Sequence, residues 1–169
     1  MRLRNLSNDD LWLYEAIHCD PAMMEHVGGP LPREGLAEKL VRDVASVEAD
    51  RSWILVIVPD EHPSTAAGNV AVWEHVMESE TVNEIGWMVL PAFQGRGLGS
   101  EAVRAVLDRA RDQGRWSPLH AFPPVSNARS NAMCRKMGFT WIRESDFTFR
   151  DRILRCNDWS LDLASPSPS

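Results

Sequence analysis

The chain has 169 residues, of which 44% are hydrophobic and 25% charged, and its formal net charge is -6 at pH 7. This length fits a single domain with one core. The acidic balance argues against a nucleic-acid partner, and no run of about eighteen apolar residues predicts a membrane span. The cysteines, 3 in number, lack metal-ligand spacing, so we expect reduced thiols in a cytoplasmic protein without a metal.

Hydrophobic periodicity predicts a mixture of strands and helices along the chain. About seven strands are expected, at residues 2–6, 53–58, 68–76, 81–90, 116–122, 139–144 and 153–163. About four helices are expected, at residues 8–19, 32–49, 98–113 and 127–137. Hairpins combined with crossover helices indicate an α/β or α+β domain over residues 1–163 with one mixed sheet. Residues 164–169 have nothing to bury, and we expect a disordered tail.

A glycine-rich loop is the most informative feature of the chain. It reads Gln94, Gly95, Arg96, Gly97, Leu98, Gly99, Ser100, and it lies between an apolar strand and an amphipathic helix. Such a loop leaves backbone N–H groups free at the start of a helix, where the helix dipole is positive. We therefore predict a site for a phosphorylated ligand.

Several known loops compete for this pattern. A Walker A loop ends in Gly-Lys-Ser/Thr, and the lysine is missing before Ser100. A dinucleotide fingerprint fits Gly97, Gly99 and Ala102, but no acidic residue closes the next predicted strand. A glycine turn that only caps a helix is the structural alternative. The third loop type, Gln-x-x-Gly-x-Gly, fits from Gln94 to Gly99.

A second motif downstream favours the third loop type, Gln-x-x-Gly-x-Gly. Asn127, Ser130, Lys136, Gly138 and Phe139 form the pattern Asn-x-x-Ser followed by Lys-x-Gly-Phe. Together the two motifs resemble the Gcn5-related N-acetyltransferase (GNAT) superfamily, over essentially residues 1–163. The segments 25–30 and 84–87 resemble the branch that acetylates the N-termini of ribosomal proteins.

The resemblance implies a GNAT fold in which parallel strands 4 and 5 splay apart, and acetyl-CoA as the cosubstrate. The pyrophosphate would sit on the N–H groups of residues 95–100, with Arg96 as a possible cationic contact. The pantetheine arm would pair with the backbone of Trp87, Met88 and Val89. Asn127 and Ser130 would lie near the pantetheine or the thioester, although Asn127 also fits a helix N-cap.

Acetyl transfer to an amine requires a neutral amine, a donor to the carbonyl oxygen and an exit for the thiolate. The backbone N–H of Met88 or Val89 is the expected donor. Glu84 is the first candidate for the general base. Glu74 with His75 is the second candidate, and His120 is the third.

Cys134 is the main departure from the family pattern, because many relatives have a tyrosine there that protonates the leaving thiolate. The thiol can act as an acid or only pack, and packing is the preferred interpretation.

The acceptor side of the site is poorly defined by the sequence. Its expected walls are His26, Trp73, Trp87, Phe147 and Phe149. A protein N-terminus, an amino acid or polyamine, or an amine-bearing antibiotic would each fit as acceptor, and the family leads us to expect a possible homodimer. The main alternative function is a CoA- or acyl-CoA-binding sensor without catalysis. A dinucleotide enzyme is a third option.

Overall fold

A computed structural model of the chain describes residues 1–77, 79–149 and 152–164, with the Phe149 side chain left out. The tail that we expected to be disordered therefore lies, beyond Ala164, outside the described residues. No helix in these ranges is long and apolar enough to cross a membrane.

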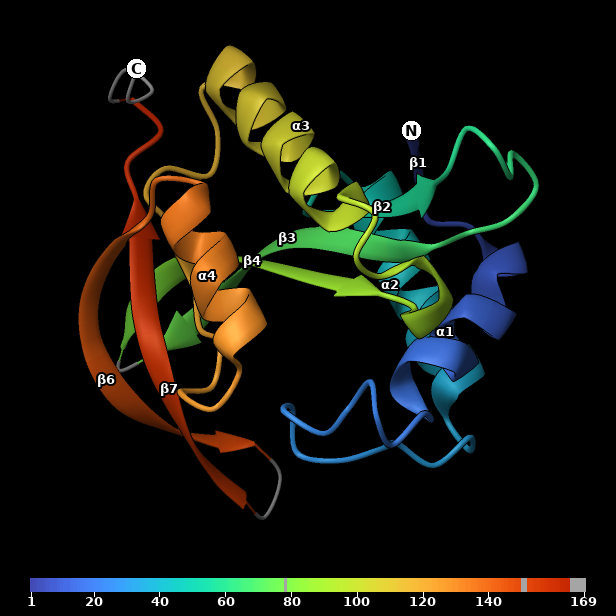
Figure 1. Cartoon of the computed structure of the whole chain (residues 1–169), viewed down its shortest axis with the longest axis horizontal. Helices are drawn as coiled ribbons and strands as arrows, with labels where there is room; N and C mark the ends of the chain where they lie inside the picture. Colours follow the sequence, from blue (N-terminus) through green and yellow to red (C-terminus); the bar gives the residue numbers. More distant parts are fainter. Residues whose placement is uncertain (78, 150–151, 165–169) are drawn as a thin grey trace.

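The strands form one 7-stranded sheet in the order β1-β2-β3-β4-β5-β7-β6 (Figure 1). The strands are β1 (Arg2–Asn5), β2 (Ser52–Val58), β3 (Gly68–Met77), β4 (Glu80–Val89), β5 (Leu119–Ala121), β6 (Thr140–Phe149) and β7 (Arg152–Leu161). Neighbouring strands run antiparallel, apart from β4 and β5, which run parallel. The predicted mixed sheet is confirmed.

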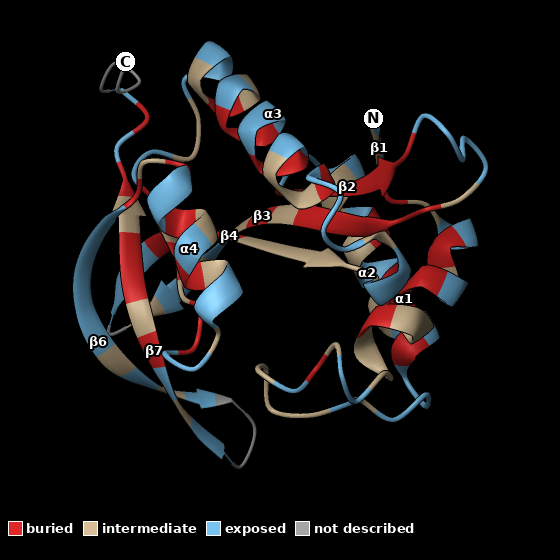
Figure 2. Cartoon of the chain, in the orientation of Figure 1, coloured by how far each residue is buried: buried red, intermediate tan, exposed pale blue. Residues whose placement is uncertain are grey.

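Two pairs of helices cover opposite faces of the sheet. Leu55 and Ile57 of β2 pack in a core with α3 (Leu98–Gln113) and α4 (Ala128–Lys136). Val56 and Val58 pack in a second core with α1 (Leu11–His18) and α2 (Leu36–Glu48). This division follows from the alternation of side chains along a strand. Figure 2 shows β2 and the first half of β3 largely buried between the layers, and β6 largely exposed at one edge.

Strands β4 and β5 separate after a very short pairing. Asn83 pairs with Leu119 and Glu84 with His120, and β4 then continues to Val89 after β5 has ended at Ala121. On its other side β4 stays paired with β3 as far as Val89. The far end of β4 therefore has one open backbone edge, as the family resemblance implied.

Three predicted boundaries are wrong. Helix α2 begins at Leu36 rather than near residue 32, because Gly35 adopts a left-handed conformation (φ 82°) just before it. Strand β5 is shorter than residues 116–122, since Trp116 also has a positive φ of 64° and Pro118 has no N–H to donate. Strand β6 extends to Phe149 because the hairpin with β7 continues beyond the core.

Candidate functional site

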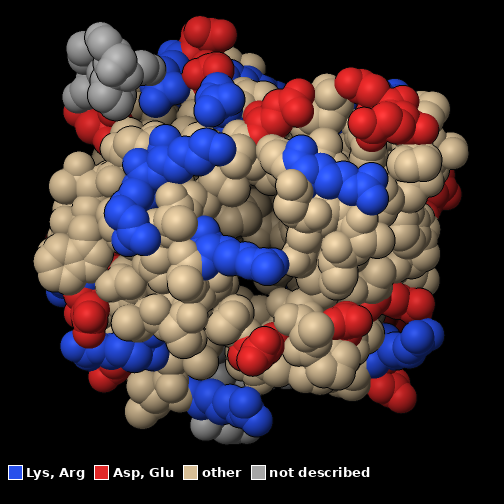
Figure 3. All heavy atoms as spheres, viewed as in Figure 1, with Lys and Arg blue, Asp and Glu red and all other residues tan. Residues whose placement is uncertain are grey.

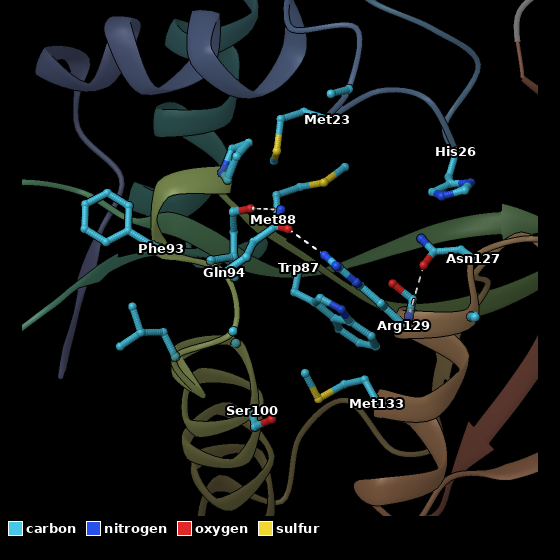
Figure 4. A pocket seen from close by; sticks show the side chains of 18 of the residues that line it. Met23, His26, Trp87, Met88, Phe93, Gln94, Ser100, Asn127, Arg129 and Met133 are labelled. Carbon is cyan, nitrogen blue, oxygen red and sulfur yellow. Dashed lines mark hydrogen bonds between the residues drawn. The ribbon is translucent and has the colours of Figure 1, made fainter.

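A cavity of about 1010 Å³ opens at the separated end of β4 (Figure 4). Its walls come from β4, the glycine loop, the start of α4 and the loop between α1 and α2. The predicted site residues that line it are Trp87, Met88, Val89, Gln94, Gly95, Gly97, Leu98, Gly99, Ser100, Asn127 and Ser130. The structure thus brings together the two sequence motifs, which are about thirty residues apart in the chain.

The glycine loop delivers the first turn of α3 to this cavity. Gly95 and Gly97 have φ values of 76° and 81°, in the left-handed region that favours glycine. Gly97 is the N-cap of α3. A Cβ on Gly99 would lie 3.2 Å from the Val89 side chain, so the missing side chain lets the helix approach β4 closely. The first-turn N–H groups of an α-helix have no partner within the helix, so this wall has the geometry that can bind an anion.

Gln94 and Arg129 form a bridge across the cavity. The Gln94 amide donates from Nε2 to the Val89 carbonyl oxygen at 2.9 Å, and its Oε1 accepts from Arg129 Nη1 at 2.7 Å. Figure 4 shows the Arg129 side chain reaching from α4 toward Gln94. Sequence reasoning missed Arg129. The available signal was its place two residues after Asn127, in the first turn of the motif helix.

The start of α4 is fixed by two asparagines. Asn127 Oδ1 accepts from the Ser130 N–H at 3.0 Å, which is the N-cap role considered for it. Asn131 is buried, and its amide donates to the carbonyl oxygens of Pro124 and Asn127. These bonds hold the β5–α4 loop and the cap together at the cavity wall.

Arg129 and Glu25 are the charged residues that line the cavity, and further basic side chains lie near it although the whole chain is acidic. Lys136 Nζ donates to Ser100 Oγ at 3.1 Å, which links α4 to the first turn of α3. Arg96 does not line the cavity, and its guanidinium lies 5.5 Å from the centre of the Phe93 ring. Figure 3 shows Lys and Arg side chains on several sides of the hollow at the centre of this face. This local charge suits an anionic ligand.

Glu84 lies four residues before Met88 on β4 and does not line the cavity. Both side chains point to the same face of the sheet, since side chains alternate along a strand. Glu84 Oε2 lies 2.9 Å from His75 Nε2, and this pairing raises the pKa of the His75 imidazole. Glu84 is partly buried, with 21% of its side chain exposed.

Cys134 lies in the core under α4, with no exposed surface. It is not among the cavity-lining residues, and burial raises the pKa of its thiol to about 12. A thiol in this environment is a small apolar side chain in the packing between α4 and the sheet.

The expected acceptor walls are only partly assembled. His26 and Trp87 line the cavity, and His26 Nδ1 lies 3.4 Å from Ser126 Oγ across the opening. Trp73 lies against Gly86 on β4, and Phe147 packs on Phe122 at 4.8 Å between ring centres. The Phe149 side chain lies outside the described residues. Sequence reasoning also missed Met23, Phe93 and Met133, which line the cavity as apolar residues without a motif.

Comparison with known proteins identifies the family. Residues 1–140 match the family model described as the acetyltransferase (GNAT) domain. The uncharacterized protein YkkB of Bacillus subtilis is 25% identical over 144 residues, which are 85% of this chain and 83% of that protein.

Solved structures of acetyltransferases share the fold. The ribosomal L7/L12 alpha-N-protein acetyltransferase RimL, in complex with coenzyme A, superposes with a TM-score of 0.78 at 16% identity, covering 95% of this chain and 92% of that chain. A chimera of the spermidine N-acetyltransferase SpeG from Vibrio cholerae gives a TM-score of 0.77 at 15% identity, covering 96% and 95%. With the family model matching most of its length, the chain belongs to the acetyltransferase (GNAT) family and is an acetyl-CoA-dependent N-acetyltransferase.

Proposed function

We propose that the cavity binds acetyl-CoA and that the acetyl group passes to a primary amine by direct attack in a ternary complex. The observation that carries this proposal is the junction of two features in one cavity. The first turn of α3 offers N–H groups for a pyrophosphate, and the open edge of β4 offers backbone groups for an extended pantetheine arm. The catalytic unit would comprise residues 1–163.

The cofactor contacts follow from these two walls. We assign the pyrophosphate to the N–H groups of residues 95–100, and the basic residues around the cavity support an anion there. We assign the pantetheine to Trp87, Met88 and Val89, with Asn127 and Ser130 on the opposite wall. The Gln94 amide donates a hydrogen bond to the Val89 carbonyl oxygen. This bond must break before a pantetheine amide can donate to the same oxygen.

Strand geometry selects one donor for the thioester carbonyl. The Leu90 N–H donates to Ala67 on the β3 side, whereas the Val89 carbonyl points away from β3 to Gln94. Because the N–H and C=O of one residue point to the same edge and alternate along the strand, the Val89 N–H faces the open edge. We therefore propose Val89 rather than Met88 as the donor that stabilises the oxyanion.

We propose Glu84 as a general base for the acceptor amine and Cys134 as a packing residue only. Two observations support the role of Glu84: its side chain is partly exposed, and it lies at the last rung where β4 and β5 pair. The burial of Cys134 supports the second assignment. With no acidic thiol at the site, the CoA sulfur would leave as a thiolate and take its proton from water.

We propose a primary amine as the acceptor. RimL acts on the ribosomal protein L7/L12, and SpeG is named for spermidine. A primary amine is common to both, and the acidic net charge of this chain favours a cationic acceptor through long-range attraction. The three free thiols support a cytoplasmic location.

The test is release of CoA thiol from acetyl-CoA with three amines: a short peptide with a free N-terminus, spermidine and 2-phenylethylamine. We expect turnover with at least one. Glu84→Gln should lower kcat by about 100-fold or more with an unchanged Kd for CoA. Glu74→Gln is the matched control, because Glu74 is exposed on the neighbouring strand. Tight CoA binding without thiol release from any amine would instead support the sensor function.

A further inference from the structure

Four alternating imidazole and carboxylate groups cross the sheet on the face opposite α3 and α4. They are His75 on β3, Glu84 on β4, His120 on β5 and Asp158 on β7, and we call them the acid–base row. His75 Nε2 lies 2.9 Å from Glu84 Oε2, and His120 Nδ1 lies 2.7 Å from Asp158 Oδ1. Glu84 and His120 stand directly opposite each other in the parallel register, so the two pairs are neighbours.

One aromatic ring joins the two imidazoles. Phe122 stacks on His120, with ring centres 5.8 Å apart and an angle of 17°, and meets His75 edge-on at 6.4 Å. Phe147 packs on Phe122 at 4.8 Å. These contacts hold both rings in place without using their ring nitrogens, which leaves one nitrogen of each ring to contact the neighbouring carboxylate.

The position of the row in the sheet links it to the reaction. The pair Glu84 and His120 is the last rung before β4 and β5 separate. The open edge that begins there is the stretch to which the proposed function assigns the pantetheine and thioester. Neither Glu84 nor His120 lines the cavity itself, so the rung lies beside the cavity, where the open edge of β4 begins.

The two ends of the His120–Asp158 pair differ in accessibility. Asp158 has 6% of its side chain exposed, whereas His120 has 21%. Because the Asp158 carboxylate accepts at Nδ1, the neutral ring carries its proton there and has its lone pair on Nε2. Ser160 Oγ lies 3.4 Å from Nε2, at the long limit of a hydrogen bond, so this lone pair is open to a stronger donor.

We propose that His120 is a second catalytic base beside Glu84 and that Asp158 is its positioning residue. This inference rests on the proposed function. A primary amine is mostly an ammonium ion at neutral pH and must lose two protons to become an amide. The first proton passes from the ammonium through water to His120 Nε2. The neutral nitrogen then attacks the carbonyl, the N–C bond forms and the C–S bond breaks. The second proton passes through water to Glu84, because five residues of extended strand separate Glu84 from the Val89 N–H, and CoA leaves as a thiolate.

Charged and titratable groups face His120 from each neighbouring element. Glu84 lies beside it on β4, with His75 beyond on β3, and Asp158 and Ser160 face it from β7. Arg143 of β6 lies 4.0 Å from the second oxygen of Asp158.

The first experiment compares His120→Gln and Asp158→Asn with the wild type on ethylamine, 2-fluoroethylamine and 2,2,2-trifluoroethylamine. Fluorine makes the ammonium more acidic at little change in size, so the need for a base falls along the series. At pH 7 we expect both variants to lose about 100-fold in kcat/KM on ethylamine and much less on trifluoroethylamine. An Asn at position 158 can donate to Nδ1 and impose the wrong tautomer. Ser160→Ala is the control, with kcat/KM within about twofold and the same Kd for CoA.

Four outcomes would overturn the proposal. A uniform loss along the amine series indicates a structural role for His120 and overturns it, as does unchanged kcat/KM in an active enzyme. A wild type that releases no CoA thiol from any amine overturns the proposed function as well. Nitrogen NMR of the wild-type protein needs no substitution, and it should show the proton of the neutral His120 imidazole on Nδ1. A proton on Nε2 would contradict the assignment.

Discussion

The buried amide of Asn131 is expected to control both the stability of the fold and the shape of the cavity wall at the start of α4. Its Nδ2 donates to the carbonyl oxygens of Pro124 at 2.9 Å and Asn127 at 2.8 Å. Its Oδ1 accepts from Asn157 Nδ2 at 2.7 Å and from Trp159 Nε1 at 2.9 Å. One side chain, 5% exposed, therefore ties α4 to β7 and to the loop before α4.

The substitution Asn131→Leu removes all of these bonds and leaves buried partners behind. A net value of about 1 kcal/mol for each bond, with an extra cost for the unpaired Trp159 N–H, gives about 5 kcal/mol of loss. Burial of the leucine side chain returns about 2 kcal/mol. We expect the free energy of unfolding to fall by about 3 kcal/mol, which lowers the melting temperature by about 6–12 °C.

Urea unfolding and CoA titration test this prediction together. Ala132→Leu, which places the same residue on the exposed side of α4, is the control and should stay within about 0.5 kcal/mol of the wild type. Asn131→Leu should also weaken CoA binding, because the Asn127 cap loses its support. A loss of under about 1 kcal/mol would show that the network contributes little beyond what apolar packing supplies, and would refute the reasoning.

Three further predictions address the loop, the thiol and pH. Gly97→Glu should weaken CoA binding by about 100-fold, because φ at this position is 81° and a carboxylate repels the pyrophosphate. Gly114→Asn, at a left-handed position at the other end of α3, is the control and should leave CoA binding unchanged. Equal CoA affinity in the two variants would contradict the loop assignment. Cys134→Ser should leave kcat within about twofold but lower the melting temperature, since the hydroxyl is buried; a tenfold fall in kcat with an intact fold would give the thiol a chemical role. Burial lowers the pKa of His18 to about 4, so folding stability should fall by about 2 kcal/mol between pH 6.5 and 5, as the unfolded chain takes up the proton that the folded chain excludes. Urea unfolding of His18→Gln should show a weaker pH dependence over that range, and an equal slope would contradict the burial effect.

The order of elements was predictable because their periodicities are strong. The amphipathic pattern of α3 indicates a helix with one buried face, and the continuous apolar run of β2, rich in β-branched residues, indicates a strand buried on both faces. The boundaries at Leu36 and Leu119 were not predictable, because they depend on left-handed conformations at Gly35 and Trp116. A positive φ at a tryptophan has no signal in residue type.

The site residues also divide into those that local patterns predict and those that only the fold brings together. The glycine loop and the Asn127 motif were predictable as local patterns, since each forms its backbone geometry within a few residues. The acid–base row was only partly visible, as separate candidates at Glu84, His75 and His120. The partner of His120 is about forty residues away on β7, and only the sheet register brings Asp158 opposite β5. Pairings between distant strands are set by the fold rather than by local sequence.

Strand β7 connects α4, at the cavity wall, to the acid–base row through consecutive side chains. Asn157 and Trp159 bond to Asn131 on the α4 face, and Asp158 between them bonds to His120 on the other face. A bulge in β6 between Trp141 and Arg143 sits opposite this stretch. If β7 sets both contacts, a shift at Asn131 must also move Asp158. We therefore expect Asn131→Leu and Asp158→Asn to be non-additive in kcat/KM, with a coupling of about 0.5–1 kcal/mol in a double-mutant cycle. Strict additivity would mean that the two faces of β7 respond independently.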